Sequence, residues 1–172
     1  MANQVFEAVR TVLAIRAYQD RPVPDEVITR IVEAGRLSAS SLNLQPWHFV
    51  VVRDREGLRA LGRLVSTGPY TAQAAFAIVA AYERSSPYGV SDVSRAIQTM
   101  ILTAWAEGVG SNWTGFGGLE EVREHVGLDP RYEVLAVVPF GYPAGRVGLG
   151  RKNRRPIGEV VSAERAGTPF GE

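Results

Sequence analysis

The sequence predicts an α+β fold, with helices and strands mixed along one domain spanning residues 1–172. Some stretches repeat apolar residues every three or four positions, as amphipathic helices do, and others are short continuous apolar runs typical of buried strands. The two kinds follow each other without the regular strand–helix–strand alternation of a doubly wound sheet. The length suits one domain with a sizeable core, and no internal repeat or low-complexity linker divides it.

The first 37 residues are predicted to form two helices joined by an extended segment. Residues 4–15 carry apolar side chains at helical spacing: Val5, Phe6, Val9, Val12 and Leu13. Residues 16–24 are expected to be extended because they contain two prolines. A second helix starts near Pro24, with Asp25 and Glu26 in the first turn, where the helix dipole favours acidic groups. Its predicted buried stripe is Val27, Ile28, Ile31, Val32 and Leu37.

The rest of the chain alternates irregularly between helical and extended patterns. Short helices are predicted at 56–64 and 119–126, and apolar strands at 49–52, 74–83 and 134–143. A longer helix, at 92–107, is apolar most of the way round in its second half. A helix of that kind is buried on most sides, so it is either the central helix of the domain, a subunit interface, or both.

Composition excludes several classes of function. A hydrophobic content of 45% with 22% charged residues is typical of a soluble globular protein. The net charge of +1 creates no general attraction for nucleic acid or anionic lipid. Without cysteine, the chain has no thiol catalysis, disulfide or thiolate metal site. No targeting leader or apolar run near 18 residues is present, so we expect a cytoplasmic protein with no membrane partner.

Two familiar kinds of site do not fit the sequence. The glycines of "EGVGSNWTGFGG" have Trp113 where a dinucleotide fingerprint needs its third glycine, and a helix precedes them where a strand is required. The two histidines, His48 and His125, are too few for an ordinary metal cage, and no serine has a nucleophile elbow around it. We expect His125 to be a solvated helix residue and His48 to pack beside Trp47.

Two polar segments each admit two interpretations. In "SASSLNLQPWHF" the small polar side chains suit a helix-to-strand connection whose groups bond one another, and they equally suit a ligand-binding loop. In "GRKNRRP" the cations are either a solvated tail or a phosphate site. The apolar residues Ile157, Val160 and Val161 that follow predict that this segment is held against the body of the protein.

Taken together, these segments resemble the nitroreductase family of FMN-dependent oxidoreductases. The similarity runs from about residue 15 to 161 and includes the Ser-Ser-x-Asn-x-Gln-Pro-Trp core at 40–47, the helix and turn "AIQTMILTAWAEGVGSNWTGF", and the later "FGYP" and "KNRRP". The resemblance implies a three-layer fold in which helices flank a mixed, mainly antiparallel sheet. It also implies an intertwined homodimer with FMN at the subunit interface, NAD(P)H as hydride donor, and a small acceptor such as a nitroaromatic or quinone.

The resemblance also assigns roles to individual residues. Ser40 and Ser41 would contact the flavin of the other subunit, while Asn43 and Gln45 would fix the loop and the ring edge. Arg16 matches a basic position that stabilises negative charge on the reduced ring, although an ion pair with Asp20 is the simpler interpretation of Arg16 alone. The turn at Thr114 and Gly115 would approach the reactive flavin nitrogen, and Lys152 and Arg154 would bind the phosphate. The flavin carries the chemistry, so no side chain is expected to act as a nucleophile.

The chain departs from the family pattern at Val12, Leu13 and Ala14, where the family has basic residues and a serine that hold the FMN phosphate. Because each hydrogen bond to a charged group contributes about 1.5–3 kcal/mol, FMN would bind more weakly by about 100-fold. Two alternatives to an FMN oxidoreductase follow. One is a family member that uses another flavin or a deazaflavin, and the other is a cofactor-poor relative that carries or senses a small aromatic ligand.

Overall fold

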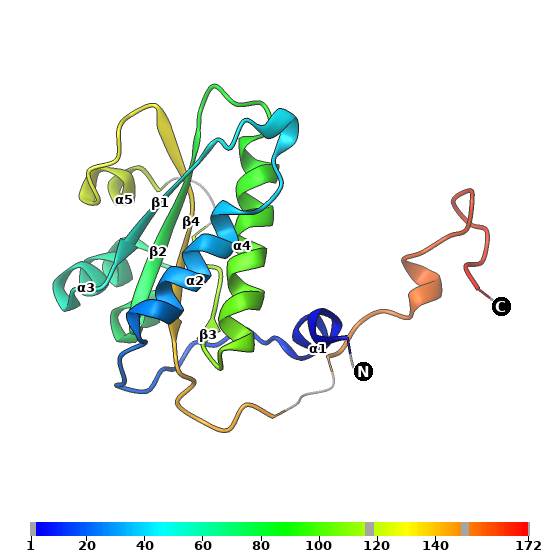
Figure 1. The fold of residues 1–172 in the computed structure, drawn as a ribbon, viewed down its shortest axis with the longest axis horizontal. Coiled ribbons are helices and arrows are strands. Elements are labelled where there is room, and N and C mark those ends of the chain that lie inside the picture. The colour runs from blue at the N-terminus through cyan, green and yellow to red at the C-terminus, as the bar shows by residue number, and fades with distance from the viewer. Residues whose placement is uncertain (1–2, 116–118, 149–151, 172) are drawn as a thin grey trace.

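A computed structural model of the chain describes residues 3–115, 119–148 and 152–171 (Figure 1). Its centre is a four-stranded sheet in the order β1-β2-β4-β3, and neighbouring strands run antiparallel throughout. The strands are β1 (Trp47–Val52), β2 (Phe76–Glu83), β3 (Gly110–Ser111) and β4 (Tyr132–Gly141). A parallel pairing joins Ala14 to Ser111 as an isolated bridge at the β3 edge. The predicted α+β class with a mixed, mainly antiparallel sheet is confirmed.

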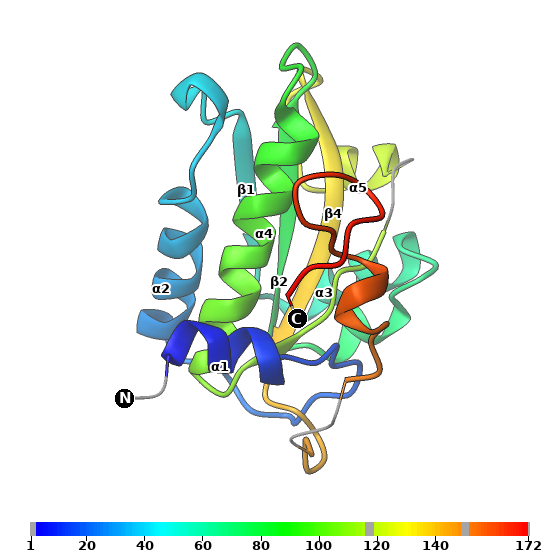
Figure 2. The same cartoon turned by 90° about the vertical axis from the view of Figure 1, so that its right-hand side faces the viewer.

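Helices cover both faces of the sheet and make a three-layer structure (Figures 1 and 2). One face packs against α2 (Asp25–Arg36) and α4 (Gly89–Ala106), and the other packs against α3 (Arg55–Leu64) and α5 (Glu120–His125). Strand β2 lies inside the sheet, so both of its faces are buried, which explains its unbroken apolar sequence. Its residues alternate between the two cores, Phe76, Ile78 and Ala80 in one and Ala77, Val79 and Ala81 in the other.

Several helices begin where their sequences predict. Pro24 directly precedes α2, whose buried residues include Val27, Ile28 and Ile31. The carboxylate of Asp54 accepts a 2.6 Å hydrogen bond from the amide of Gly57 and so caps α3. These local signals do not depend on the rest of the fold, and the helices predicted at these positions are confirmed.

The long helix α4 is the central helix of the domain. Ile97, Met100 and Ala104 are buried between the sheet and α2. Beside this buried face, Ile101, Leu102 and Trp105 are only half-buried. The helix therefore has an apolar surface left over after its own core is complete.

Three local predictions are wrong. Helix α1 (Gln4–Thr11) ends before Val12, which has φ −55° and ψ 133°, so residues 12–15 are extended and the predicted stripe is interrupted. Leu37 is 67% exposed because it caps α2 from outside the helix. Strand β1 lies at the sheet edge, so only Val52 among its six residues is buried.

The C-terminal segment, residues 152–171, runs away from the three layers past α1 (Figure 1). Ile157, Val160 and Phe170 are each more than half exposed. The basic segment is held against the body as predicted, with Lys152 bonded to Val9, but the apolar residues that were expected to hold it are exposed. Among the residues that the structure describes, no helix is long and apolar enough to cross a membrane.

Candidate functional site

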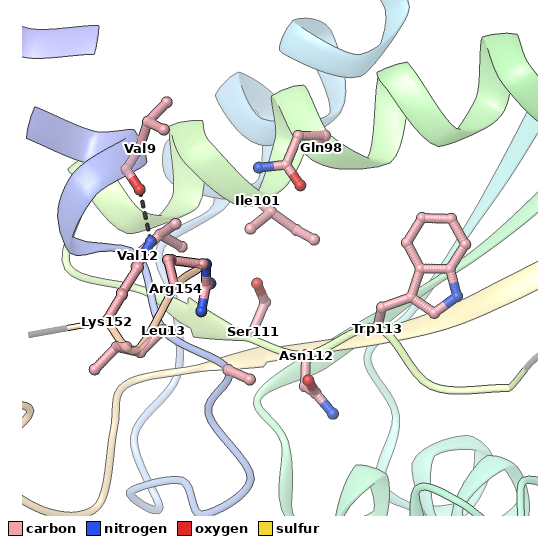
Figure 3. A pocket seen from close by; sticks show the side chains of 11 residues that line it. Val9, Val12, Leu13, Gln98, Ile101, Ser111, Asn112, Trp113, Lys152 and Arg154 are labelled. Carbon is pink, nitrogen blue, oxygen red and sulfur yellow. Dashed lines mark hydrogen bonds between the residues drawn. The ribbon is translucent and has the colours of Figure 1, made fainter. Parts of the chain in front are cut away.

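An open cavity of about 560 Å³ lies at the β3 edge of the sheet, between the end of α1 and the side of α4. Its volume is within the range of small-molecule sites. Figure 3 shows its lining: Val9, Val12, Leu13, Ala14, Gln98, Ile101, Ser111, Asn112, Trp113, Lys152 and Arg154. The walls come from four separate parts of the chain, so the cavity exists only in the folded protein.

The extended segment after α1 forms one wall because it is hydrogen-bonded to β3. The amide of Ile15 donates a 2.9 Å hydrogen bond to the carbonyl of Ser111. Gly110 allows this close approach, since a β-carbon there would clash with the Ile15 side chain. The glycine that suggested a dinucleotide fingerprint therefore has a packing role. Tyr18 anchors the same segment further on, with its hydroxyl donating a 2.7 Å hydrogen bond to the carbonyl of Ile15.

Lys152 and Arg154 line the cavity on the side of Val12 and Leu13 (Figure 3). The ammonium of Lys152 donates a 2.6 Å hydrogen bond to the carbonyl of Val9. Partial burial and, next, the nearby Arg154 guanidinium hold the pKa of Lys152 below its usual range. Both effects disfavour the charged ammonium of Lys152. An anion beside Lys152 and Arg154 would favour the charged form again and raise the pKa of Lys152.

Of the cations next to this pair, the structure describes Arg155, which follows the alternation expected of an extended segment. Arg155 is exposed and does not line the cavity. Arg151, predicted to point to solvent, lies outside the described residues.

Polar side chains from α4 and β3 face the cavity opposite the cations. Gln98 comes from the middle of α4 and the buried Ser111 from β3. The side chain of Asn112 points away from that of Ser111 (Figure 3), and its amide nitrogen donates a hydrogen bond to the Tyr70 hydroxyl. Sequence reasoning missed all three residues. Gln98 lies three positions before Ile101 and hence on the same helix face, which is the signal that could have identified it.

Thr114 and Gly115 lie next to the cavity without lining it. The backbone of Thr114 exchanges hydrogen bonds of 3.0 and 2.9 Å with Val137, and its side chain is buried beside Thr67. The Thr67 hydroxyl also accepts a 3.1 Å hydrogen bond from the amide of Gly115, whose φ of +77° suits glycine. The indole of Trp113 donates to the Gly115 carbonyl, so this turn is firmly held.

Arg16 lies in an adjoining hollow of about 310 Å³, which shares Leu13 and Ala14 with the cavity. Its side chain is exposed. Among the described residues, no ion pair joins Arg16 to Asp20, so the simpler interpretation of Arg16 does not hold.

The Ser40–Gln45 loop is not part of this cavity within one chain. It lies beside the start of α4, where Ser41 bonds Asp92, whereas the cavity uses Gln98 and Ile101. Nine residues of helix between Asp92 and Ile101 correspond to about 14 Å. The Ser40 hydroxyl accepts a 3.0 Å hydrogen bond from the amide of Gln45, and the Gln45 side chain donates to the Asn43 carbonyl. The hydrogen bonds of these four predicted site residues therefore run within the loop and to Asp92: Ser40, Ser41, Asn43 and Gln45.

Comparison with known proteins places this architecture in a family. The model of the Nitroreductase family matches residues 10–83 and 66–142. A protein of Methanothermobacter thermautotrophicus named "Putative NADH dehydrogenase/NAD(P)H nitroreductase" is 36% identical over 152 residues, which cover 84% of this chain and 80% of the relative.

Two solved structures share the whole fold. A protein of Bacteroides thetaiotaomicron with the same name is 28% identical, with a TM-score of 0.88 over 96% of this chain and 100% of the other. A protein of Desulfovibrio desulfuricans described as "a putative nitroreductase in complex with fmn" is 30% identical, with a TM-score of 0.84 over 99% of this chain and 100% of the other.

Proposed function

This chain belongs to the nitroreductase family, and we propose that it is an FMN-dependent oxidoreductase. In this proposal a reduced nicotinamide donates hydride and a small nitroaromatic or quinone accepts the electrons. The Desulfovibrio desulfuricans relative was solved with FMN, and a Bacillus subtilis relative, 24% identical over 178 residues, is named "FMN reductase [NAD(P)H]".

The observation that carries the proposal is the pairing of two cations with an apolar wall in one cavity. FMN has a dianionic phosphate at one end and a flat, largely apolar ring at the other. Lys152 and Arg154 supply positive charge on one side, while Ile101 and Trp113 supply apolar surface. The residues present therefore fit this cofactor.

The chain's own residues would bind and orient the cofactor. Lys152 and Arg154 would hold the phosphate, and the polar groups of Gln98 and Ser111 line the cavity where they could hydrogen-bond the rest of the molecule. Arg16, two residues beyond Ala14 on the cavity wall, would supply positive charge near the ring edge. Bound FMN would supply the hydride-accepting chemistry, which protein side chains lack.

The apolar residues 12–14 predict that phosphate binding is weaker here than in relatives with basic residues at those positions. Val12, Leu13 and Ala14 all line the cavity, and none can donate a side-chain hydrogen bond. The same observation supports the second candidate, a carrier or sensor of a small aromatic ligand, because an apolar wall without full phosphate recognition suits such a ligand.

We propose that the active form is a homodimer. Apolar side chains of α1 and the C-terminal segment are left exposed, among them Val5, Phe6, Ile157 and Val160. A second copy would cover these surfaces and the half-buried side of α4. It would also bring its own Ser40–Gln45 loop toward the cavity, which one chain by itself does not do.

The visible spectrum of the purified protein during titration with FMN tests the proposal. Bands of oxidised flavin, bleached by NADH or NADPH and restored by a quinone, are the expected result. A protein that stays colourless in excess FMN but binds a small aromatic ligand would replace the oxidoreductase with the carrier.

A further inference from the structure

The Ser40–Gln45 loop has a costly backbone conformation. Leu42, Asn43 and Gln45 have φ values of 53°, 56° and 49°, which is the left-handed region that favours glycine. Three such residues within four positions persist only if surrounding contacts determine the conformation. Hydrogen bonds within the loop hold its shape but do not fix it to the rest of the protein.

The contact that fixes the loop is Asp92, in the first turn of α4. Its side chain is fully buried. One carboxylate oxygen accepts a 3.1 Å hydrogen bond from the amide of Ser41, and the other accepts a 3.3 Å bond from the Ser41 hydroxyl. Arg95, one turn further along α4, also donates to the carboxylate. A second link, at 3.0 Å between the hydroxyls of Ser38 and Thr99, holds the chain just before the loop.

A carboxylate at this position needs an explanation beyond packing. Burying a charge is unfavourable unless it is paired and hydrogen-bonded, and an apolar side chain would fill the same space without that penalty. The α4 dipole and Arg95 compensate the charge. Both carboxylate oxygens accept from Ser41, and the one that accepts from the Ser41 hydroxyl is shared with Arg95 and, at 3.5 Å, with the Ser91 hydroxyl. The arrangement therefore matches the needs of the loop more closely than those of the core.

We propose that Asp92 is a positioning residue that fixes the Ser40–Gln45 loop in the conformation that reaches the flavin of a second copy. This inference rests on the proposed function and on the homodimer. Asp92 itself does not touch the cofactor; it acts through Ser41. Because the loop is expected at the ring and ribityl chain, loss of Asp92 should weaken flavin binding without affecting phosphate recognition.

The test compares Asp92→Asn with a matched control, Ser94→Ala. Asparagine keeps the size of the side chain but loses the charge and one acceptor. Ser94 is a nearby residue of α4, and its hydroxyl bonds the carbonyl of Val90 and does not contact Asp92. Amide hydrogen exchange of residues 41–45 reports the loop, and fluorescence titrations with FMN and with riboflavin, which lacks the phosphate, report binding.

In Asp92→Asn we expect the amides of the loop to exchange at least about tenfold faster. We also expect FMN and riboflavin to bind about tenfold more weakly, with the same loss of affinity for both flavins. Ser94→Ala should change neither measurement. Unchanged flavin affinity despite a loosened loop would overturn the inference, as would a loss confined to FMN. Failure of the wild-type protein to bind either flavin would instead contradict the proposed function.

A measurement on the unmodified protein keeps the inference testable if Asp92→Asn does not fold. The Ser41 amide, bonded to a buried carboxylate, should exchange about 100-fold more slowly than an unprotected amide. Free exchange at Ser41 in the wild-type protein would show that Asp92 does not hold the loop, whatever the variant does.

Discussion

The ammonium of Lys152 donates a 2.6 Å hydrogen bond to the carbonyl of Val9, joining residues at opposite ends of the chain. Val9 lies in the last turn of α1, where the carbonyls have no partner within the helix. A cation is favourable there because it also complements the helix dipole. Lys152 therefore caps α1 and supplies charge to the cavity at the same time.

We predict that the double variant Lys152→Ala/Arg154→Ala loses FMN affinity selectively. Each charged hydrogen bond to phosphate is worth about 1.5–3 kcal/mol, so the pair should weaken FMN by about 100-fold or more. Riboflavin, without a phosphate, should bind as before. Arg155→Ala is the matched control, and its FMN affinity should stay within about twofold, as expected of an exposed side chain outside the cavity. Equal losses in both variants would mean diffuse charge and no defined phosphate site.

FMN binding should weaken at alkaline pH because of Lys152. Burial and Arg154 lower the pKa of Lys152, so its ammonium is lost at a lower pH than that of a free lysine. FMN affinity should fall as the pH rises through this lowered value, and riboflavin affinity should not. Lys152→Arg, which stays charged, should abolish the fall. An identical pH profile in the variant would assign the effect to another group.

The lowered pKa of Lys152 also predicts how the free energy of unfolding of the protein without cofactor depends on pH. Between the lowered pKa of folded Lys152 and the higher pKa of the unfolded chain, the unfolded state binds more protons. The contribution of this residue to the free energy of unfolding should therefore increase with pH in that window. Comparing urea unfolding of the wild type and of Lys152→Arg across the window would measure it.

Restoring polar groups to the cavity wall should tighten FMN. Val12 is half-buried and Ala14 exposed, and both line the open cavity, so Val12→Arg with Ala14→Ser can place donors there without entering the core. The gain should be about tenfold or more per effective contact. The melting temperature without cofactor should not change. A lower melting temperature with no gain in affinity would show that these side chains pack a site built for another ligand.

Gly110→Ala should destabilise the protein, because the new β-carbon would overlap the Ile15 side chain. Overpacking of this kind costs about 1–3 kcal/mol. Ile15→Ala should relieve part of that cost, so the double variant should be more stable than the sum of the two single losses predicts. Gly158→Ala, with open space around it, is the control and should be near neutral. Additive losses at residues 110 and 15 would contradict the close approach.

Light scattering at micromolar concentration should show a dimer, as expected if the interface buries more than about 1,200 Å². Phe6→Glu puts a charge on the exposed apolar side of α1 and should shift the dimer toward monomer. The same charge change on that helix in Gln4→Glu should have little effect. A monomeric wild-type protein would remove the shared flavin site from the proposal.

Local patterns alone determined most of the secondary structure. The unbroken apolar run of β2, the Pro24 start of α2 and the Asp54 cap of α3 depend on near neighbours in the chain, and these elements form where predicted. The identity of the cation pair could also be predicted, because "KNRRP" places Lys152 and Arg154 on alternate positions of an extended segment. Periodicity of this kind is a property of a few consecutive residues, so it is visible without the fold.

Tertiary structure decided where those elements end and which surfaces meet. Val12 and Leu13 continue the helical spacing of α1, yet the chain leaves the helix there because Ile15 pairs with Ser111, nearly a hundred residues away. Ile157 and Val160 are apolar, which predicts that something covers them but not which surface does so. The dependence of Ser41 on Asp92 is likewise invisible in the sequence, because a hydrogen bond between residues 51 positions apart exists only after the sheet and α4 have packed.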